Sequence, residues 1–284
     1  MANSNKRKPH YSKKHQTGLT LIELLISLVI GLFLLVGITS SYLSSKKNSI
    51  QRNEFSMLED NGRLALEVLK STIQHAGYSS TNGATITDKF MNDSVESYTC
   101  RTVDGVGGVS VKNEALFSSD STEDGAESDS IGVAYYGDSI LSTDCAGQTL
   151  PLGCQFTPGA NIEASRIYNA FYVDDNEQLL CAGSRADTAQ VIADGVENLQ
   201  VLYGVDANGD NSADRYVSHD DVNDLWGQVV NVQIGVLVKS SKQIKDVAES
   251  EVFTLLDKVI TISPADRYQR AVFSTTITLR NSIN

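Results

Sequence analysis

The stretch KKHQTGLTLIELLISLVIGLFLLVGITSSYL, residues 13–43, decides how this sequence must be read. Its apolar run from Leu19 to Ile38 is about 20 residues long, the length that a helix needs to cross the hydrocarbon core of a bilayer. The run contains one charged residue, Glu23. A carboxylate at membrane depth costs roughly 2.5–3.5 kcal/mol or more, so an acidic residue in this place indicates a functional site.

A basic head precedes the apolar run, which is also the arrangement of a secretory signal peptide. The apolar region of a signal peptide has only about 7–15 residues, and no small-x-small cleavage site follows the run in this chain. We therefore expect the helix to remain on the mature protein as a single membrane span. Because basic flanks stay in the cytoplasm, the C-terminal bulk of the chain is expected across the membrane. The basic residues are Lys6, Arg7, Lys8, Lys13 and Lys14.

The residues from Gly18 to Glu23, GLTLIE, resemble the processing signal of type IV pilins and pseudopilins. The resemblance implies that a prepilin peptidase removes the leader, residues 1–18, by cutting between Gly18 and Leu19, and that Leu19 is N-methylated. Glu23 is then the fifth mature residue and matches the family's glutamate. The new amine at Leu19 offers Glu23 a partner, in its own chain or in a neighbouring subunit, and buried charges are tolerated mainly when paired. The alternative is a hydrated Glu23 at headgroup level without a partner.

The rest of the chain is acidic. The formal net charge is −12, and the basic head contains no acid. An acidic body repels nucleic acid, so direct nucleic-acid binding is not expected. The sequence has no G-x-S-x-G, no H-E-x-x-H and no phosphate-binding glycine loop, so we do not expect an enzyme.

Apolar residues recur at helical spacing after the membrane segment, residues 19–43. Residues 44–77 are therefore expected to continue the same helix as an amphipathic half whose apolar stripe faces a sheet. Gly77 is expected to stop the helix, and Gly62 indicates either a weak point or a close approach of another segment. The recurring apolar residues are Leu58, Leu64, Ala65, Val68, Leu69, Ile73 and Ala76.

Residues 79–130 are rich in turn-forming and polar residues and are expected to form loops. The acidic residues near their end are expected to form a solvated face; they are Glu123, Asp124, Glu127 and Asp129.

Residues 78–284 are expected to form a periplasmic β domain. The segment 130–138 is typical of a strand, and residues 166–183 are expected to form a hairpin that turns at 174–176. Alternating apolar residues predict further strands around 195–206, 229–240 and 271–281. One long helix packed on an antiparallel sheet with long loops is an α+β fold.

The segments GVENLQVLYGVDANGDNSADRYV (residues 195–217) and RAVFSTTITLRN (residues 270–281) resemble the PilW family of type IV pilus minor pilins. That family is related to the J-type pseudopilins of type II secretion. The resemblance implies a pilin-like fold and a structural role in a filament.

Four cysteines in a body expected to be exported suggest two disulfides. Three pairings are open. The short separation of Cys145 and Cys154 favours that pair, which leaves Cys100 with Cys181. The alternative is four unpaired buried thiols.

The segment DANGDNSAD places Asp206, Asn208, Asp210 and Asp214 at positions 1, 3, 5 and 9 of a short loop. Oxygen ligands that alternate in this way can wrap a hard cation such as Ca²⁺. The loop departs from the EF-hand pattern because position 12 is Val217 rather than glutamate. The alternative is a turn rich in Asp and Asn, which these residues also favour.

We expect a structural minor pilin that helps to prime assembly of a type IV pilus and sits at or near its tip. The resemblance implies as partners other minor pilins, the major pilin, the inner-membrane assembly platform and the prepilin peptidase. It also implies an inner-membrane location with the C-terminal domain in the periplasm, followed by the pilus filament at the cell surface. No cofactor is required, apart from the calcium ion considered above. The alternatives are a J-type pseudopilin of a type II secretion system and, more remotely, a membrane-anchored periplasmic enzyme.

Overall fold

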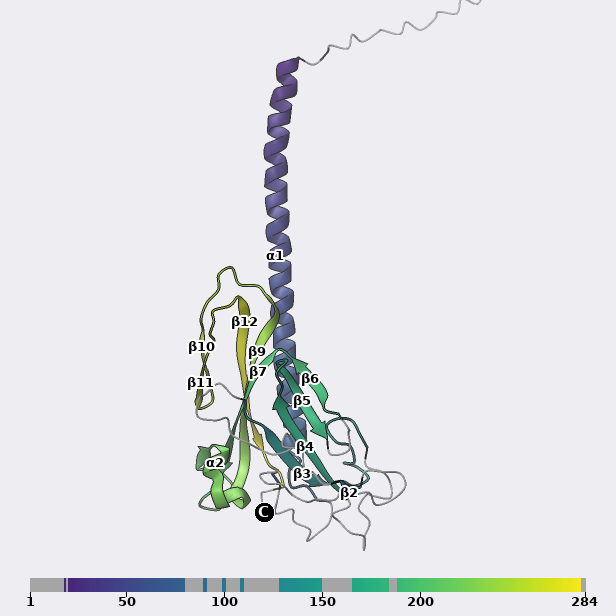
Figure 1. Ribbon diagram of the computed structural model, residues 1–284, viewed down its shortest axis with the longest axis vertical. Helices are drawn as coiled ribbons and strands as arrows, with labels where there is room; N and C mark the ends of the chain where they lie inside the picture. Colours follow the sequence, from purple (N-terminus) through teal and green to yellow (C-terminus); the bar gives the residue numbers. More distant parts are fainter. Residues whose placement is uncertain are drawn as a thin grey trace, which may run out of the picture. The chain divides into compact units, whose positions relative to one another are not determined.

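The computed structural model describes residues 18, 20–79, 89–90, 128–149, 165–183 and 188–281, and the backbone of 99–100 and 108–109 (Figure 1). The chain divides into two compact units, one up to Ile50 and one from Gln51 onward. Each unit is described by itself below.

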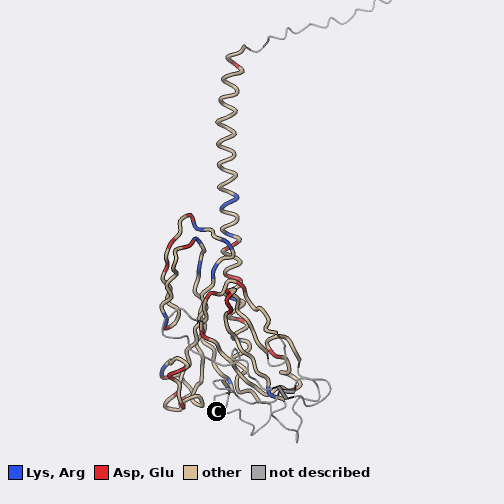
Figure 2. Tube along the Cα trace, viewed as in Figure 1, with Lys and Arg blue, Asp and Glu red and all other residues tan. Residues whose placement is uncertain are grey.

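Helix α1 spans Leu21–Ile73 and is the first element of the chain. The residues from Leu21 to Ile50 are all exposed, although most of them as far as Ile38 are large and apolar. This N-terminal part of α1 is long and apolar enough to cross a membrane. Figure 2 shows that the charged positions of the chain lie almost entirely outside it. In water such a surface is unfavourable, so it needs lipid or other apolar helices around it.

The second half of α1 belongs to the unit that starts at Gln51, and it buries one stripe. The apolar residues of the stripe recur at spacings of three or four, as the sequence predicts for an amphipathic helix. The helix ends at Ile73, slightly before the expected end at residue 77, in a turn that leads to Gly77. Gly77 has φ 76°, a left-handed conformation that glycine adopts without a steric cost. The stripe consists of Leu58, Gly62, Ala65, Leu69 and Ile73, with Ala76 in the turn.

The first sheet has the strand order β12-β9-β7-β8, and all neighbours are antiparallel. The valines and isoleucine that alternate along β9, from Val230 to Val238, are buried as expected. Those from Val232 to Val238 form a core with the stripe of α1, because strand residues two apart point to the same face. The strands are β7 (Val196–Val205), β8 (Arg215–Val217), β9 (Val229–Gln243) and β12 (Tyr268–Thr278).

The second sheet has the order β3-β4-β5-β6 and is also antiparallel. One of its faces joins the same core through Ile131, Phe171 and Leu179. The predicted hairpin is confirmed: its turn follows Asp174, whose Oδ1 accepts the backbone N–H of Gln178 (2.9 Å). The strands are β3 (Ile131–Tyr136), β4 (Arg166–Val173), β5 (Gln178–Gly183) and β6 (Gln190–Asp194). The sequence pattern predicts the α+β class but not this division into two sheets.

The remaining elements are short. The hairpin of β10 (Val252–Leu255) and β11 (Lys258–Thr261) was not predicted, although two apolar runs flank Leu256 and Asp257. Its inner residues Leu255 and Ile260 pack on Leu237 of β9. Strands β1 (Thr99–Cys100) and β2 (Gly108–Val109) pair with each other. Helix α2 (His219–Val222) leads into a 3₁₀ turn at Asn223–Gln228.

The expected solvated acidic face is wrong for Asp129, which is buried. Its Oδ2 accepts the backbone N–H of Val201 (2.8 Å), and its own N–H donates to the carbonyl oxygen of Leu199 (2.8 Å). Asp129 thereby joins the segment before β3 to β7. The local polar composition could not reveal this partner, which is about 70 residues away in the chain. Glu123, Asp124 and Glu127 lie outside the described residues.

Glu54 is a buried carboxylate on the stripe of α1. It accepts hydrogen bonds from the Ser241 hydroxyl (2.6 Å), the Lys242 backbone N–H (3.2 Å) and the Lys242 ammonium (2.9 Å). One turn away, the Gln51 side-chain amide donates to the carbonyl oxygen of Ile244 (2.9 Å). These bonds hold the C-terminal end of β9 against the helix, and the Ser241 bond in particular keeps the pKa of Glu54 below its usual range.

We expect Gly62→Ala to destabilise the second unit by about 1–3 kcal/mol, because a Cβ at Gly62 would overlap the ring of Phe273 on β12. The free energy of unfolding is measured by circular dichroism on the full chain in detergent. Gly37→Ala is the matched control, since a Cβ there has no neighbour within 4 Å. Adding Phe273→Leu to Gly62→Ala should restore part of the stability. Equal stability of Gly62→Ala and the parent chain would contradict the close approach.

We expect Glu54→Gln to cost about 1–3 kcal/mol at neutral pH, because it weakens hydrogen bonds to a buried charge. The folded-state pKa of Glu54 is lowered, so its stabilisation is complete above the unfolded value of about 4.3 and is lost as the pH falls through the folded value. The difference between parent and variant should therefore shrink in acid. Glu59→Gln, on an exposed face of the same helix, is the control. A pH-independent difference would show that the charge of Glu54 is not what stabilises the contact.

Candidate functional site

The start of α1 brings Thr20 and Glu23 together. Oε2 of Glu23 accepts hydrogen bonds from the Thr20 backbone N–H (2.8 Å) and the Thr20 hydroxyl (2.9 Å). The backbone N–H of Glu23 points in turn at the Thr20 hydroxyl oxygen (3.4 Å). This reciprocal exchange is a capping box, which satisfies donors that the first turn of a helix leaves unpaired. The carboxylate also lies at the positive end of the helix dipole.

Thr20 is the residue of this site that the sequence analysis missed. The spacing T-x-x-E is itself the signature of a capping box, but only the glutamate was singled out. Within the described part of the chain, Oε1 of Glu23 has no hydrogen-bond donor, so half of the carboxylate is not used by the cap. Leu19 lies outside the described residues, and the pairing of Glu23 with a Leu19 amine stays a prediction.

Gly18, the expected cleavage position, is exposed. Among the described residues, no atom lies within 4 Å of the place that a Cβ would take there. Gly18 itself is therefore sterically accessible.

The loop between β7 and β8 gathers the four residues proposed as calcium ligands. Asp206 is buried at its start, and its carboxylate faces into the turn. Burial raises the pKa of Asp206, but four backbone hydrogen bonds together outweigh that effect and hold the pKa below its usual value. Oδ1 accepts the N–H groups of Asn208 (3.2 Å), Gly209 (2.6 Å) and Asp210 (3.3 Å), and Oδ2 accepts that of Asn211 (2.8 Å).

The carboxylates of Asp214 and Asp210 also accept backbone N–H groups of the loop. Oδ2 of Asp214 accepts the backbone N–H of Ala207 (2.8 Å), and Oδ1 of Asp210 accepts that of Ser212 (2.9 Å). Among the described residues, no group of three or more His, Cys, Asp or Glu side chains is arranged to hold a metal ion. The residues in this arrangement fit a self-capped turn rather than a calcium site, and calcium binding stays a prediction from spacing alone.

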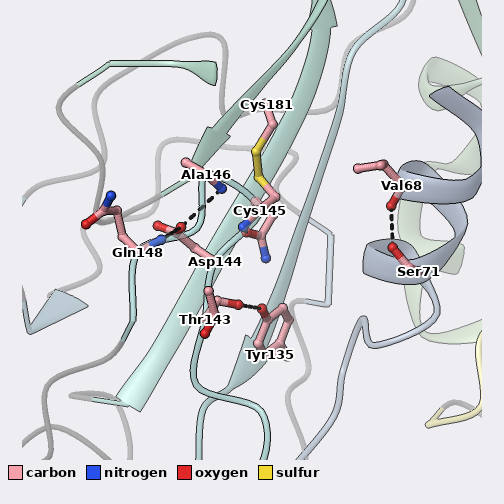
Figure 3. Close-up of a disulfide and its surroundings, with 10 residues drawn as sticks. Val68, Ser71, Tyr135, Thr143, Asp144, Cys145, Ala146, Gln148 and Cys181 are labelled. Atoms are coloured by element: carbon pink, nitrogen blue, oxygen red, sulfur yellow. Dashed lines mark hydrogen bonds between the residues drawn. A yellow bond between two sulfur atoms is a disulfide. The ribbon is translucent and has the colours of Figure 1, made fainter. Parts of the chain in front are cut away.

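Cys145 and Cys181, which are 36 positions apart in sequence, form a disulfide with Cα atoms 6.1 Å apart (Figure 3). Cys181 is buried in β5. The backbone N–H of Cys145 donates to Oδ1 of Asn169 on the neighbouring strand β4 (2.6 Å). The bridge therefore fastens the loop after β3 to the second sheet.

The predicted pairs Cys145–Cys154 and Cys100–Cys181 are both wrong. Closeness along the chain suggested the first, but hydrogen bonds fold the loop back toward β5. Oδ1 of Asp144 accepts the N–H groups of Ala146 (3.1 Å) and Gln148 (2.8 Å), and the Tyr135 hydroxyl donates to the carbonyl oxygen of Thr143 (2.8 Å). Cys154 and the side chain of Cys100 lie outside the described residues.

A charged cleft of about 480 Å³ lies beside the β10–β11 hairpin. Arg270 of β12 makes paired hydrogen bonds to Glu197 (2.6 and 2.9 Å) and to Asp266 (2.8 and 2.6 Å). The Arg270 guanidinium holds the pKa of Asp266 below its usual range. Lys239 of β9 forms ion pairs with Glu197 and with Glu177. Because these ionised groups satisfy one another, the cluster ties three strands together and needs no ligand.

Two family models match parts of this chain. Residues 170–281 match the family described as Type IV pilus-assembly protein W, PilW. Residues 13–39 match the prokaryotic N-terminal methylation motif, and they include the capping box of Thr20 and Glu23.

Among solved structures, a type IV-like pilin from Thermus thermophilus is similar, with a TM-score of 0.40 and 12% sequence identity. The similarity covers 80% of this chain and 98% of that chain. No curated protein sequence matches the chain.

The disulfide predicts a specific peptide in a non-reducing chymotryptic digest. Trypsin leaves Cys145 and Cys154 in one peptide, whereas chymotrypsin separates them by cutting after Leu152. We expect the peptide that contains Cys145 to be linked to the one that begins at Cys181, and the link to disappear on reduction. A link between the Cys145 and Cys154 peptides would contradict the structure.

Proposed function

We propose that this chain, a type IV pilin-like protein of the PilW family, is a structural minor pilin that helps to prime assembly of a pilus and sits at or near its tip. The observation that carries the proposal is the site at the start of α1. An exposed Gly18 precedes a membrane-length apolar helix with one charged residue in its apolar part, Glu23. Thr20 holds Oε2 of Glu23, and Oε1 is left for another partner. A structural subunit needs such a site for processing and docking, and it needs no catalytic residues or cofactor.

Processing prepares the site for assembly. A cut between Gly18 and Leu19 leaves the Thr20 N–H and hydroxyl intact, so the capping box survives in the mature chain. The new amine lies four residues before Glu23, about one helical turn away. Oε1 of Glu23, which the cap leaves over, is the oxygen that meets this amine or that of a neighbour. Such an ion pair offsets the desolvation free energy of the two buried charges. It also fixes the axial register between subunits.

The same features support the proposed location of the chain. Before assembly the helix spans the inner membrane, with the basic leader in the cytoplasm and the unit from Gln51 onward in the periplasm. During assembly the apolar surface of α1 leaves lipid for the helices of other subunits. The partners are therefore other minor pilins, the major pilin and the assembly platform, with the prepilin peptidase acting first.

Mass spectrometry of filaments sheared from cells tests the proposal. We expect an N-methylated peptide that begins at Leu19, in filaments of the parent strain and not in those of a strain that lacks this chain. If the chain is found only in membranes and still begins before Gly18, the proposal fails. If it is processed but occurs with a secretion system in a strain without pili, the pseudopilin alternative replaces it.

Glu23→Ala should still be inserted and cleaved but should enter filaments at least about tenfold less, the effect of losing one or two charge-assisted hydrogen bonds. The amount of chain in filaments relative to membranes is measured by quantitative mass spectrometry. Ser27→Ala is the matched control, because Ser27 only donates to the carbonyl oxygen of Glu23 (2.7 Å) one turn further along. Normal incorporation of Glu23→Ala would disprove the pairing.

Gly18→Glu should block cleavage, because it places a bulky charge at the exposed position before the scissile bond. The variant should accumulate in the membrane with its leader attached, which the N-terminal peptide reveals. A processed product would show that the cleavage site lies elsewhere.

A further inference from the structure

Strand β12 forms one edge of the first sheet, and its only partner among the described residues is β9. The N–H of Leu279 donates to the carbonyl oxygen of Val230 (2.9 Å). In an antiparallel pair every second residue bonds to the partner strand, so this bond shows which residues of β12 face β9. The odd-numbered residues of β12 from Ala271 onward thus bond to β9. The backbone N–H and C=O groups of the even-numbered residues point away from it, and the side chains of those residues are exposed. These residues are Val272, Ser274, Thr276 and Thr278.

This edge lacks the features that normally prevent strand addition. Nine consecutive residues, 271–279, carry no charge, no proline and no glycine, in a chain whose net charge is −12. The register with β9 is regular from Arg270 to Thr278, so no bulge interrupts the edge there. An uncharged edge of this length is a template for another strand.

The other edges of the two four-stranded sheets are protected. β8 has only three residues, and one of them is Arg215. β6 carries a register irregularity and ends at the exposed Asp194. β3 is covered by the chain after α1, because its Ala134 N–H donates to the carbonyl oxygen of Lys89 (3.0 Å). Among the edge strands of these two sheets, β12 therefore has the edge that is best suited to pairing with another strand.

A groove of about 360 Å³ continues this edge at its N-terminal end, where Gln269 lies. Phe55 of α1 is 46% exposed at the groove, although it is one of the largest apolar side chains outside the membrane-length segment. Arg52 beside it has no ion-pair partner within the described residues. The groove is lined by Gln51, Arg52, Phe55, Ile244, Lys245 and Gln269.

We propose that β12 and this groove form a docking site for an extended, uncharged segment of a neighbouring filament subunit, which adds to the sheet as a strand. The partner's backbone pairs with the even-numbered residues of β12. An apolar side chain of the partner covers Phe55, and an acidic residue just beyond the partner's uncharged stretch meets Arg52. The inference rests on the proposed function only in identifying the partner as another subunit anchored in the same membrane.

A second copy of this chain fits the site poorly. β12 runs in the direction of α1: Gly62 lies against Phe273, and the Asn281 amide donates to the carbonyl oxygen of Ala76 (3.3 Å). Two copies paired antiparallel through β12 would therefore direct the helical residues 51–73 of the two copies oppositely. Subunits of one filament point the same way, so the proposed function argues against this pairing.

The test is photo-crosslinking of the full chain in cells, with a photoreactive amino acid at Ser274. A matched probe at Thr254, which is also exposed and lies on the outer face of the β10–β11 hairpin, is the control. We expect an adduct from Ser274 and none from Thr254. The partner peptide, identified by mass spectrometry, should be an uncharged β-branched segment of a protein with its own prepilin motif.

Thr276→Pro distinguishes strand addition from simple proximity. It removes an outward-pointing N–H and leaves the bonds to β9 in place, so the Ser274 adduct should fall about tenfold, whereas Thr276→Ala should stay within about twofold. Retention of the Cys145–Cys181 peptide shows that the variant folds; if it does not fold, Thr276→Lys replaces it. An unchanged adduct, an adduct between two copies, or an adduct to a protein without a prepilin motif would overturn the inference. If the chain is missing from filaments but the Ser274 adduct with a membrane-anchored pilin-like subunit persists, the proposed function fails and the docking site stands.

Discussion

The contact between the buried stripe of α1 and the two sheets is the constraint on which the second unit depends. A single row of side chains, from Leu58 to Ala76, supplies the middle of a core that both sheets share. The helix can lie this close only because Gly62 leaves room for the ring of Phe273. Glu54 then fixes the position along the helix axis, since its three hydrogen bonds reach one end of β9. Apolar packing thus holds the layers together, and one buried charge sets their register.

The sequence predicted those parts of the structure that depend on local pattern. Apolar spacing located both halves of α1, and alternation located β9 and β12. It also placed Asp206, Asn208, Asp210 and Asp214 in one loop. What it missed depends on contacts between distant segments. Cys145 bonds to Cys181 because a hydrogen-bonded loop folds onto β4, and no spacing rule contains that geometry.

The site at the start of α1 contains a residue that the sequence pattern could have identified. Every atom of the capping box comes from residues three apart, so Thr20 was accessible to a local rule and was overlooked. The amine that the resemblance assigns to Glu23 is not part of the precursor, because the expected cleavage creates it. The structure therefore shows one partner of the carboxylate, Thr20 on Oε2, and the amine stays a prediction for Oε1.

The boundary at Ile50 has a consequence for work on the separated second unit. The membrane-length part of α1 can be removed without touching the core, because its residues are exposed. The buried part begins at Glu54, with Gln51 already bonded to Ile244. A soluble fragment must therefore begin at or before Gln51. A fragment that starts after the helix, near Tyr78, would expose the apolar faces of both sheets to water and would aggregate rather than fold.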